Sequence, residues 1–252
     1  MNFFKKKPVI LDAYTLDPTI FRLARPDHAN KFFPDWWKTL PKTVSVPGTR
    51  VPFPTVKTCR GIIDYYDRGI VIPMWTDSLI SVSDKFQKKH TITSAQQNPN
   101  PSTLPPEQWR TWISDKDFGH IKYQSPWYFN CKEDIKFVFT HPMYNSSTPQ
   151  DYLVLPGVVD FKYQHESNVN IMVEYQDKTR DIMIHAGDPL VNIFPLTERE
   201  VVINHHLVTK EELEKITLYP VVFRGVYNFF KKNIQRMEEE EKAKCPFHFG
   251  KK

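Results

Sequence analysis

The stretch "IMIHAGDPLVNIFPL", Ile182 to Leu196, decides the fold, because Gly187-Asp188-Pro189 separates two short apolar runs. Glycine supplies backbone freedom and Asp-Pro favours a tight turn, so the pattern predicts a hairpin of two strands. His185 ends the first run, where a metal-binding β-barrel would place a ligand. Turn chemistry alone explains the stretch, and we therefore assign His185 no ligand role.

Alternation with a period of two recurs on both sides of this turn. It is clearest in "IKFVFTH" (135–141) and "VNIMVEY" (169–175), and shorter runs such as "DIMIH" and "EVVIN" add further strands. Successive side chains of a strand point to opposite faces, so one face of each run should be buried. We predict a mainly β protein, a β-sandwich or jelly roll, with a shared core formed by Phe137, Phe139, Ile171, Val173, Ile184 and Phe194.

The rest of the chain is predicted to surround this sandwich within a single domain, 1–252. Prolines are frequent, 21 against 8 glycines, and we expect residues 1–55 to form an irregular arm. Within that arm "FFPDWWKTLPK" (32–42) favours a short helical turn, whose tryptophans either fasten the arm to the core or line a ligand cleft. Residues 56–204 would hold a helix and the sandwich, 205–244 a helical tail, and 245–252 a mobile end.

Two helices are predicted from their patterns. "TVKTCRGIIDYYDRG" (55–69) has an apolar face and ends in Gly69, which we expect to adopt a left-handed cap. "TKEE" (209–212) forms a capping box that opens the tail. Beyond it an amphipathic helix should pack on the sandwich through Phe223, Phe230 and Ile234, leaving Cys245–His248 in a mobile end.

Composition excludes several classes of protein. The chain is 40% hydrophobic and 25% charged, as in globular proteins, and contains no apolar run long enough to span a membrane. The short apolar run after Lys5–Lys7 leads us to expect no secretory signal. Three widely spaced cysteines suit a reducing compartment, so we expect a cytoplasmic protein. The net charge of +5 is scattered, without a basic stripe, which disfavours nucleic acid as a partner.

Motifs for catalysis are sparse. A metal site in a β-barrel usually places two ligands two residues apart on a strand, and neither His-x-His nor His-x-Asp occurs. The neighbours His205 and His206 would point to opposite faces. No metal ligand is therefore assigned and the cofactor is left open, although isolated candidates remain at His120, His141, Asp160, His165 and His185.

In order along the chain, "FPDWWKTLP", "TVKTCRGIIDYYDRGIVIPMWTD", "FGH…PW.F", "HPMYN", "LPGVVD" and "AGDPLVNIFP" resemble a family of uncharacterised proteins of tailed bacteriophages, notably marine ones, and some bacteria. The resemblance runs from about Phe32 to Leu196 and implies a cupin-like β-sandwich. It implies no activity and no catalytic residue. If the shared motifs mark a site, the matching positions are Trp75, Asp77, His120, Trp127, Asn145 and Asp160.

Three functions remain open at this point. The favoured hypothesis is a β-sandwich that binds a small molecule or peptide in an aromatic-lined cavity at one open end of the sandwich. One alternative is a non-haem metal-dependent oxygenase-like enzyme, and the other is a virion structural or host-interaction protein without catalysis.

Overall fold

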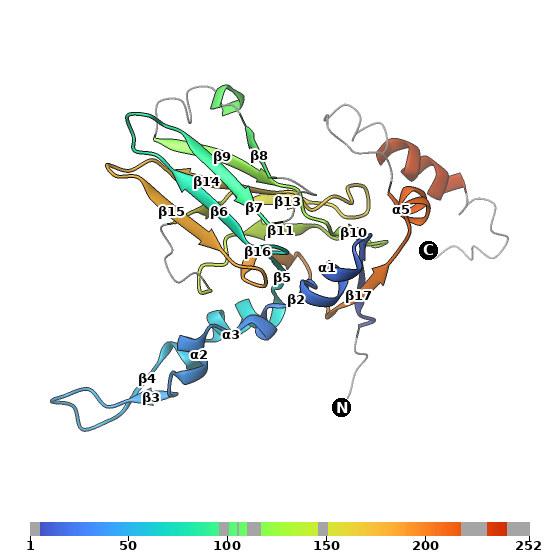
Figure 1. Cartoon of the computed structure of the whole chain (residues 1–252). Helices are drawn as coiled ribbons and strands as arrows, with labels where there is room; N and C mark the ends of the chain where they lie inside the picture. Colours follow the sequence, from blue (N-terminus) through green and yellow to red (C-terminus); the bar gives the residue numbers. More distant parts are fainter. Residues whose placement is uncertain are drawn as a thin grey trace, which may run out of the picture.

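The computed structural model describes residues 6–95, 101–104, 106–109, 117–145, 151–217 and 231–240, and strands predominate in it (Figure 1). The strands are β1 (Val9–Thr15), β2 (Asp27–His28), β3 (Thr43–Val44), β4 (Phe53–Pro54), β5 (Ile70–Pro73), β6 (Ser78–Val82), β7 (His90–Ser94), β8 (Ser102–Leu104), β9 (Phe118–Tyr123), β10 (Tyr128–Asn130), β11 (Phe137–Thr140), β12 (Leu153–Val154), β13 (Gly157–Val159), β14 (Val169–Glu174), β15 (Arg180–Ile184), β16 (Pro189–Pro195) and β17 (Val201–Leu207). The helices are α1 (Pro18–Leu23), α2 (Asp35–Thr39), α3 (Arg60–Arg68) and α5 (Lys210–Ile216), with 3-10 turns η1 (Ala29–Phe32), η2 (Val56–Thr58) and η3 (Pro106–Trp109) and a helical segment at 231–240.

The described strands form several small sheets, with orders β13-β11-β16-β5-β2, β12-β14-β9-β8, β15-β6-β7, β10-β1-β17 and β3-β4. Their pairings are antiparallel except that of β1 with β17, which is parallel. A mainly β fold with multiple antiparallel sheets is therefore confirmed.

The stretch around Gly187 is a corner between sheets and not the predicted hairpin. β15 pairs with β6, whereas β16 pairs with β11 and β5, so the two runs belong to different sheets. Gly187 has φ +92°, as the turn interpretation requires, and its N–H donates to Met74 O at 2.7 Å. The antiparallel pair β5/β16 thus bends here into the pair β6/β15.

The buried core consists of two apolar clusters, a large one that joins the four larger sheets and a small one formed by Ala29, Trp37, Tyr66 and Val71. Five of the six predicted core residues belong to the large cluster, namely Phe137, Phe139, Ile171, Val173 and Ile184. Phe194 does not, because β16 is covered on both faces and Phe194 lies on the face that packs against Tyr65, with ring centroids 5.1 Å apart. The alternation predicted strands correctly but could not say which face of a doubly covered strand meets which cluster.

The first 55 residues are not an irregular arm throughout. β1 lies at the centre of its sheet, and Val9, Leu11 and Ala13 are fully buried. The irregular part is confined to the proline-rich segment around β3 and β4, which projects away from the sheets in Figure 1. Its exposed side chains include Val51 and Phe53.

The helix predictions are confirmed in part. α2 lies where expected and the Thr209–Glu212 capping box is present. Of the helix expected over 55–69, only Arg60–Arg68 is α-helical, because Val56–Thr58 form a separate 3-10 turn. Gly69 has φ −69°, so the predicted left-handed cap is wrong. Glycine is needed there for space, because a Cβ would lie 2.6 Å from Asn192 Oδ1.

The tail is described only in part. Phe223, Phe230 and Cys245–His248 lie outside the described residues, whereas 231–240 is helical. Within the described ranges no helix has the length and apolar character to cross a bilayer.

Candidate functional site

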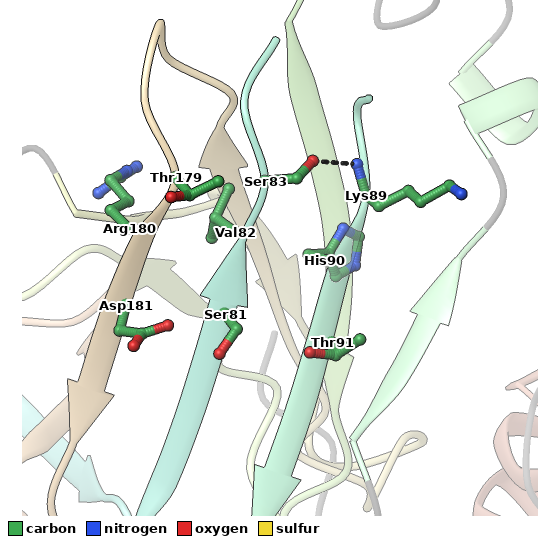
Figure 2. Close-up of a pocket in the computed structure, with 9 residues that line it drawn as sticks. All are labelled: Ser81, Val82, Ser83, Lys89, His90, Thr91, Thr179, Arg180 and Asp181. Carbon is green, nitrogen blue, oxygen red and sulfur yellow. Dashed lines mark hydrogen bonds between the residues drawn. The ribbon is translucent and has the colours of Figure 1, made fainter. Parts of the chain in front are cut away.

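The described residues form at least three cavities that are large enough to take a ligand. The first, of about 480 Å³, lies over β6, β7 and β15 and is drawn in Figure 2. Its most strongly charged group, Arg180, is already engaged by Asp151 Oδ1 at 3.2 Å, by Asp151 O and by Glu174 O, both at 3.1 Å. Lys89 N–H donates to Ser83 Oγ at 2.8 Å across the same cavity. These bonds hold the end of the sheet together, and this cavity is smaller than the two described next.

The second and third cavities adjoin each other and form one groove. Their volumes are about 770 and 780 Å³, each within the range of ligand pockets. Both are lined by Leu16, Tyr128, Glu166 and Asn168, so these four residues mark the junction. The second cavity continues between β8, β9, β13, β14 and α5, while the third runs along α1 and the segment 124–128. The groove defined by these two cavities is the candidate site.

Four polar side chains at alternate positions of the chain line one wall of this groove, and we call them the polar ladder. The chain turns at 161–163 and then runs on into β14, and over 161–170 burial alternates residue by residue, with every even position partly exposed. Gln164, Glu166, Asn168 and Asn170 thereby all line the second cavity, which is the ladder as we define it. Side chains two residues apart on an extended chain share a face, and a local period of two therefore suffices to bring the four together.

Hydrogen bonds along its length hold the ladder segment extended. Phe129 N–H donates to His165 O at 2.8 Å, and Ser167 Oγ donates to Trp127 O at 2.6 Å. From Val169 onward the chain continues as β14 and pairs with β9. The ladder is therefore anchored on rigid elements along its whole length.

The ladder leaves both donors and acceptors toward the groove. Asn168 Nδ2 donates to Glu166 Oε2 at 2.9 Å, which leaves Asn168 Oδ1 and Glu166 Oε1 as acceptors. Asn170 Oδ1 lies 3.2 Å from His120 Nε2, which leaves the Asn170 amide N–H groups as donors. Gln164 carries one donor group and one acceptor of its own.

His120, at one end of the ladder, is 4% exposed and fully engaged. Trp109 Nε1 donates to its Nδ1 at 2.8 Å, so Nδ1 carries no proton and Nε2–H donates to Asn170 Oδ1. Burial lowers the pKa of His120, and nearby Lys122 lowers it further against the opposing effect of Asn170. The ring is thus neutral, with its tautomer fixed and no nitrogen left for a metal.

His165, beside the ladder, is the opposite tautomer of His120, and only one of its ring nitrogens has a partner. It is 5% exposed, and its Nδ1 lies 2.9 Å from Phe129 O. A carbonyl accepts only, so Nδ1 carries the proton and Nε2 is an unprotonated acceptor. Nε2 has no partner within the described residues, although His165 lines the second cavity. Burial lowers the pKa of His165, which keeps the ring neutral and Nε2 unprotonated at neutral pH.

The six residues named from the sequence are not brought to one cavity. Among the three cavities, only the second contacts any of them, and it contacts His120. Trp75 and Trp127 are buried in the core, where Trp127 Nε1 donates to Ala24 O at 2.9 Å.

The side chains of the other three residues form hydrogen bonds with backbone groups. Asp77 Oδ1 accepts from Ala186 N–H at 2.9 Å and so holds the corner beside Gly187. Asn145 Nδ2 donates to Phe32 O. Asp160 Oδ1 accepts from Lys162 N–H at 3.2 Å, and burial raises the pKa of Asp160.

Among the described residues no group of three or more His, Cys, Asp or Glu side chains is arranged to hold a metal ion. His205 Nε2 contacts Pro26 O at 2.6 Å and His206 Nε2 contacts Asp12 Oδ1 at 2.9 Å, so the neighbours are engaged by different partners, as expected.

The ladder was missed because no known motif covers it. A signal was nevertheless present, since "QHESNVN" (164–170) places Gln, Glu, Asn and Asn at every second position of an extended run. Comparison with known proteins adds no assignment: the chain matches no protein-family model and no curated protein.

Proposed function

We propose that this protein binds a small polar molecule or a short peptide in the groove formed by the second and third cavities. The observation that carries the proposal is the continuity of two ligand-sized cavities across Leu16, Tyr128, Glu166 and Asn168, with the polar ladder along one wall. Ligand sites combine concave apolar walls with a few placed polar groups. This groove has both, since Leu104, Leu155 and Leu213 flank the ladder.

The favoured setting is a cytoplasmic protein of the phage family that the motifs resemble, with a jelly-roll or cupin-like arrangement of its sheets. The groove supports the binding hypothesis over the metal-enzyme alternative, because its two histidines offer one unoccupied nitrogen between them within the described residues. One imidazole cannot hold a catalytic metal without further ligands.

A blocking experiment tests this proposal. Asn168→Trp fills the junction of the two cavities, and Gln164→Trp fills the second cavity alone. Gln87→Trp, on an exposed turn between β6 and β7, is the matched control. Saturation-transfer NMR against sugars, nucleotides, amino acids and short peptides should give binders of the wild type and of Gln87→Trp.

Those binders should be lost in both groove variants, each first checked for a folded NMR spectrum. If no compound binds the wild type, or if binding survives in folded Asn168→Trp and Gln164→Trp, the groove is not the site.

A further inference from the structure

The spacing of the ladder matches one kind of ligand. Neighbouring members lie two residues apart on an extended chain, a separation of about 6.6 Å at 3.3 Å per residue. An extended peptide presents its own N–H and C=O groups toward one side with the same repeat of two residues. A peptide that runs along the ladder can therefore meet successive rungs without changing its conformation.

The hydrogen-bonding groups agree with this match. Main-chain recognition needs an acceptor for each N–H and a donor for each C=O. The acceptors are Asn168 Oδ1, Glu166 Oε1 and Gln164 Oε1, and the donors are the amide N–H groups of Asn170 and Gln164. His165 Nε2 adds an acceptor that is buried, unprotonated and without a partner in the described part of the chain.

The surroundings of the ladder suit the side chains of such a peptide. Leu104, Leu155, Val158 and Leu213 lie along the second cavity, and Ile20 and Pro126 along the third. Charges of both signs line the groove, Lys122 and Lys210 against Glu166, Glu214 and Asp17. Asp17 already accepts from the N–H groups of Thr19 and Ile20, so the lining does not select a strongly acidic or basic ligand. The groove therefore favours the uncharged main chain over a charged headgroup.

We propose that the ligand of this groove is an extended peptide, held by its main chain through the amides of Gln164, Asn168 and Asn170 and by an N–H donated to His165 Nε2. This inference rests on the proposed function of the groove and names its ligand class. Recognition through the main chain makes the protein tolerant of peptide sequence, with preference set by apolar side chains at alternate positions.

N-methylation of the ligand provides the test. A peptide selected from a random 12-residue library is resynthesised with N-methyl groups at alternate residues, in both registers. One register removes the N–H groups that face the ladder and should weaken binding about tenfold or more, while the other should leave binding nearly unchanged. Equal sensitivity or equal insensitivity of the two registers would overturn main-chain recognition.

Variants of the protein provide the second arm. Gln164→Ala and Asn168→Ala should each weaken binding about three- to tenfold in calorimetric titration, while Gln87→Ala should not change it. His165→Asn keeps an amide N–H at the position of Nδ1 and removes the Nε2 acceptor, so it should weaken binding to a similar extent without unfolding. If the ladder variants bind the peptide as the wild type does, the inference fails.

The two proposals fail in different ways. If saccharides or nucleotides bind in the groove and are displaced by Asn168→Trp while no library peptide binds, the groove is a ligand site and the peptide inference is wrong. If peptides bind equally well to Asn168→Trp and Gln164→Trp, the groove itself is excluded.

Discussion

Two histidines in the walls of the groove, His120 and His165, differ in how many of their ring nitrogens have hydrogen-bond partners, and we assign them different roles. His120 and His165 are almost equally buried, and burial lowers the pKa of both. His120 has both nitrogens engaged, by Trp109 and Asn170, whereas His165 has one engaged, by Phe129 O. His120 therefore has a structural role, in that it joins Trp109 to Asn170 in the wall of the groove, whereas His165 keeps one unpartnered acceptor beside the ladder. Burial alone does not distinguish these two histidines; the unpartnered Nε2 in the wall of the second cavity is what sets His165 apart from His120.

Truncation of Phe139, a buried side chain in the wall of the second cavity, should have the largest effect on stability. Phe139 is 4% exposed, lines the second cavity and packs against Phe161. Phe139→Ala should lower the free energy of unfolding by about 3–5 kcal/mol, because it removes a buried ring and leaves a cavity. Urea denaturation measures this loss, and a loss below about 1 kcal/mol would show that the ring contributes little to the core.

His120→Leu should have a smaller effect. The change keeps an apolar group of moderate size but leaves Trp109 Nε1–H and Asn170 Oδ1 without their partner, at a cost of about 1–3 kcal/mol. His185→Leu, at an exposed histidine, is the control and should be nearly neutral. If His120→Leu and His185→Leu both unfold at the same urea concentration as the wild type, the hydrogen bonds of His120 do not contribute to stability.

Acid should destabilise the protein through its buried histidines. Burial lowers the pKa of His90, His120, His141 and His165 below 6.5. Between the lowered value and 6.5 the unfolded chain binds more protons than the folded one, so stability falls as the pH drops through that interval.

Urea denaturation at pH 7 and pH 5 should therefore show a lower unfolding free energy at pH 5. The decrease should be smaller in His165→Asn, which removes one of the four groups. An equal decrease in the variant would contradict the buried neutral state of His165.

His165→Asn should change stability least. Asn places an amide N–H near the position of Nδ1, so the bond to Phe129 O is kept, and we expect a change within about 1 kcal/mol. His165→Ala loses that bond and should cost more. If His165→Asn is as destabilising as His165→Ala, then Nε2 has a structural partner and the acceptor is not open to the groove.

Local patterns predicted strands such as β11, β14, β15 and β17, the turn at Gly187 and the tail capping box, because each depends on residues close in sequence. They failed at Val9–Thr15, where proline content nearby suggested an irregular arm but tertiary pairing with β17 buries the strand. They also failed at Ile182–Leu196, where the partner of each strand is set by distant segments and the hairpin proved to be a corner.

The site was harder to predict than the fold. Trp75, Asp77, Trp127, Asn145 and Asp160 carry the residue types of a binding site, and the structure engages them in core packing or backbone hydrogen bonds. The ladder shows as a period of two in polar residues, a pattern that equally fits a solvated strand face. Only the opposing walls from β8, β13 and α5 make it a groove, and those contacts are not local in sequence.

The state of the His165 ring tests the account most directly. Long-range ¹H–¹⁵N NMR spectra at pH 7, assigned by the loss of signals in His165→Asn, report which imidazole nitrogen carries the proton. We predict Nδ1 protonated and Nε2 bare in the free protein, with the Nε2 resonance of His165 shifting on addition of the selected peptide while that of His120 stays fixed. A protonated Nε2 in the free protein, or a His165 resonance that does not respond to a bound peptide, would contradict the account.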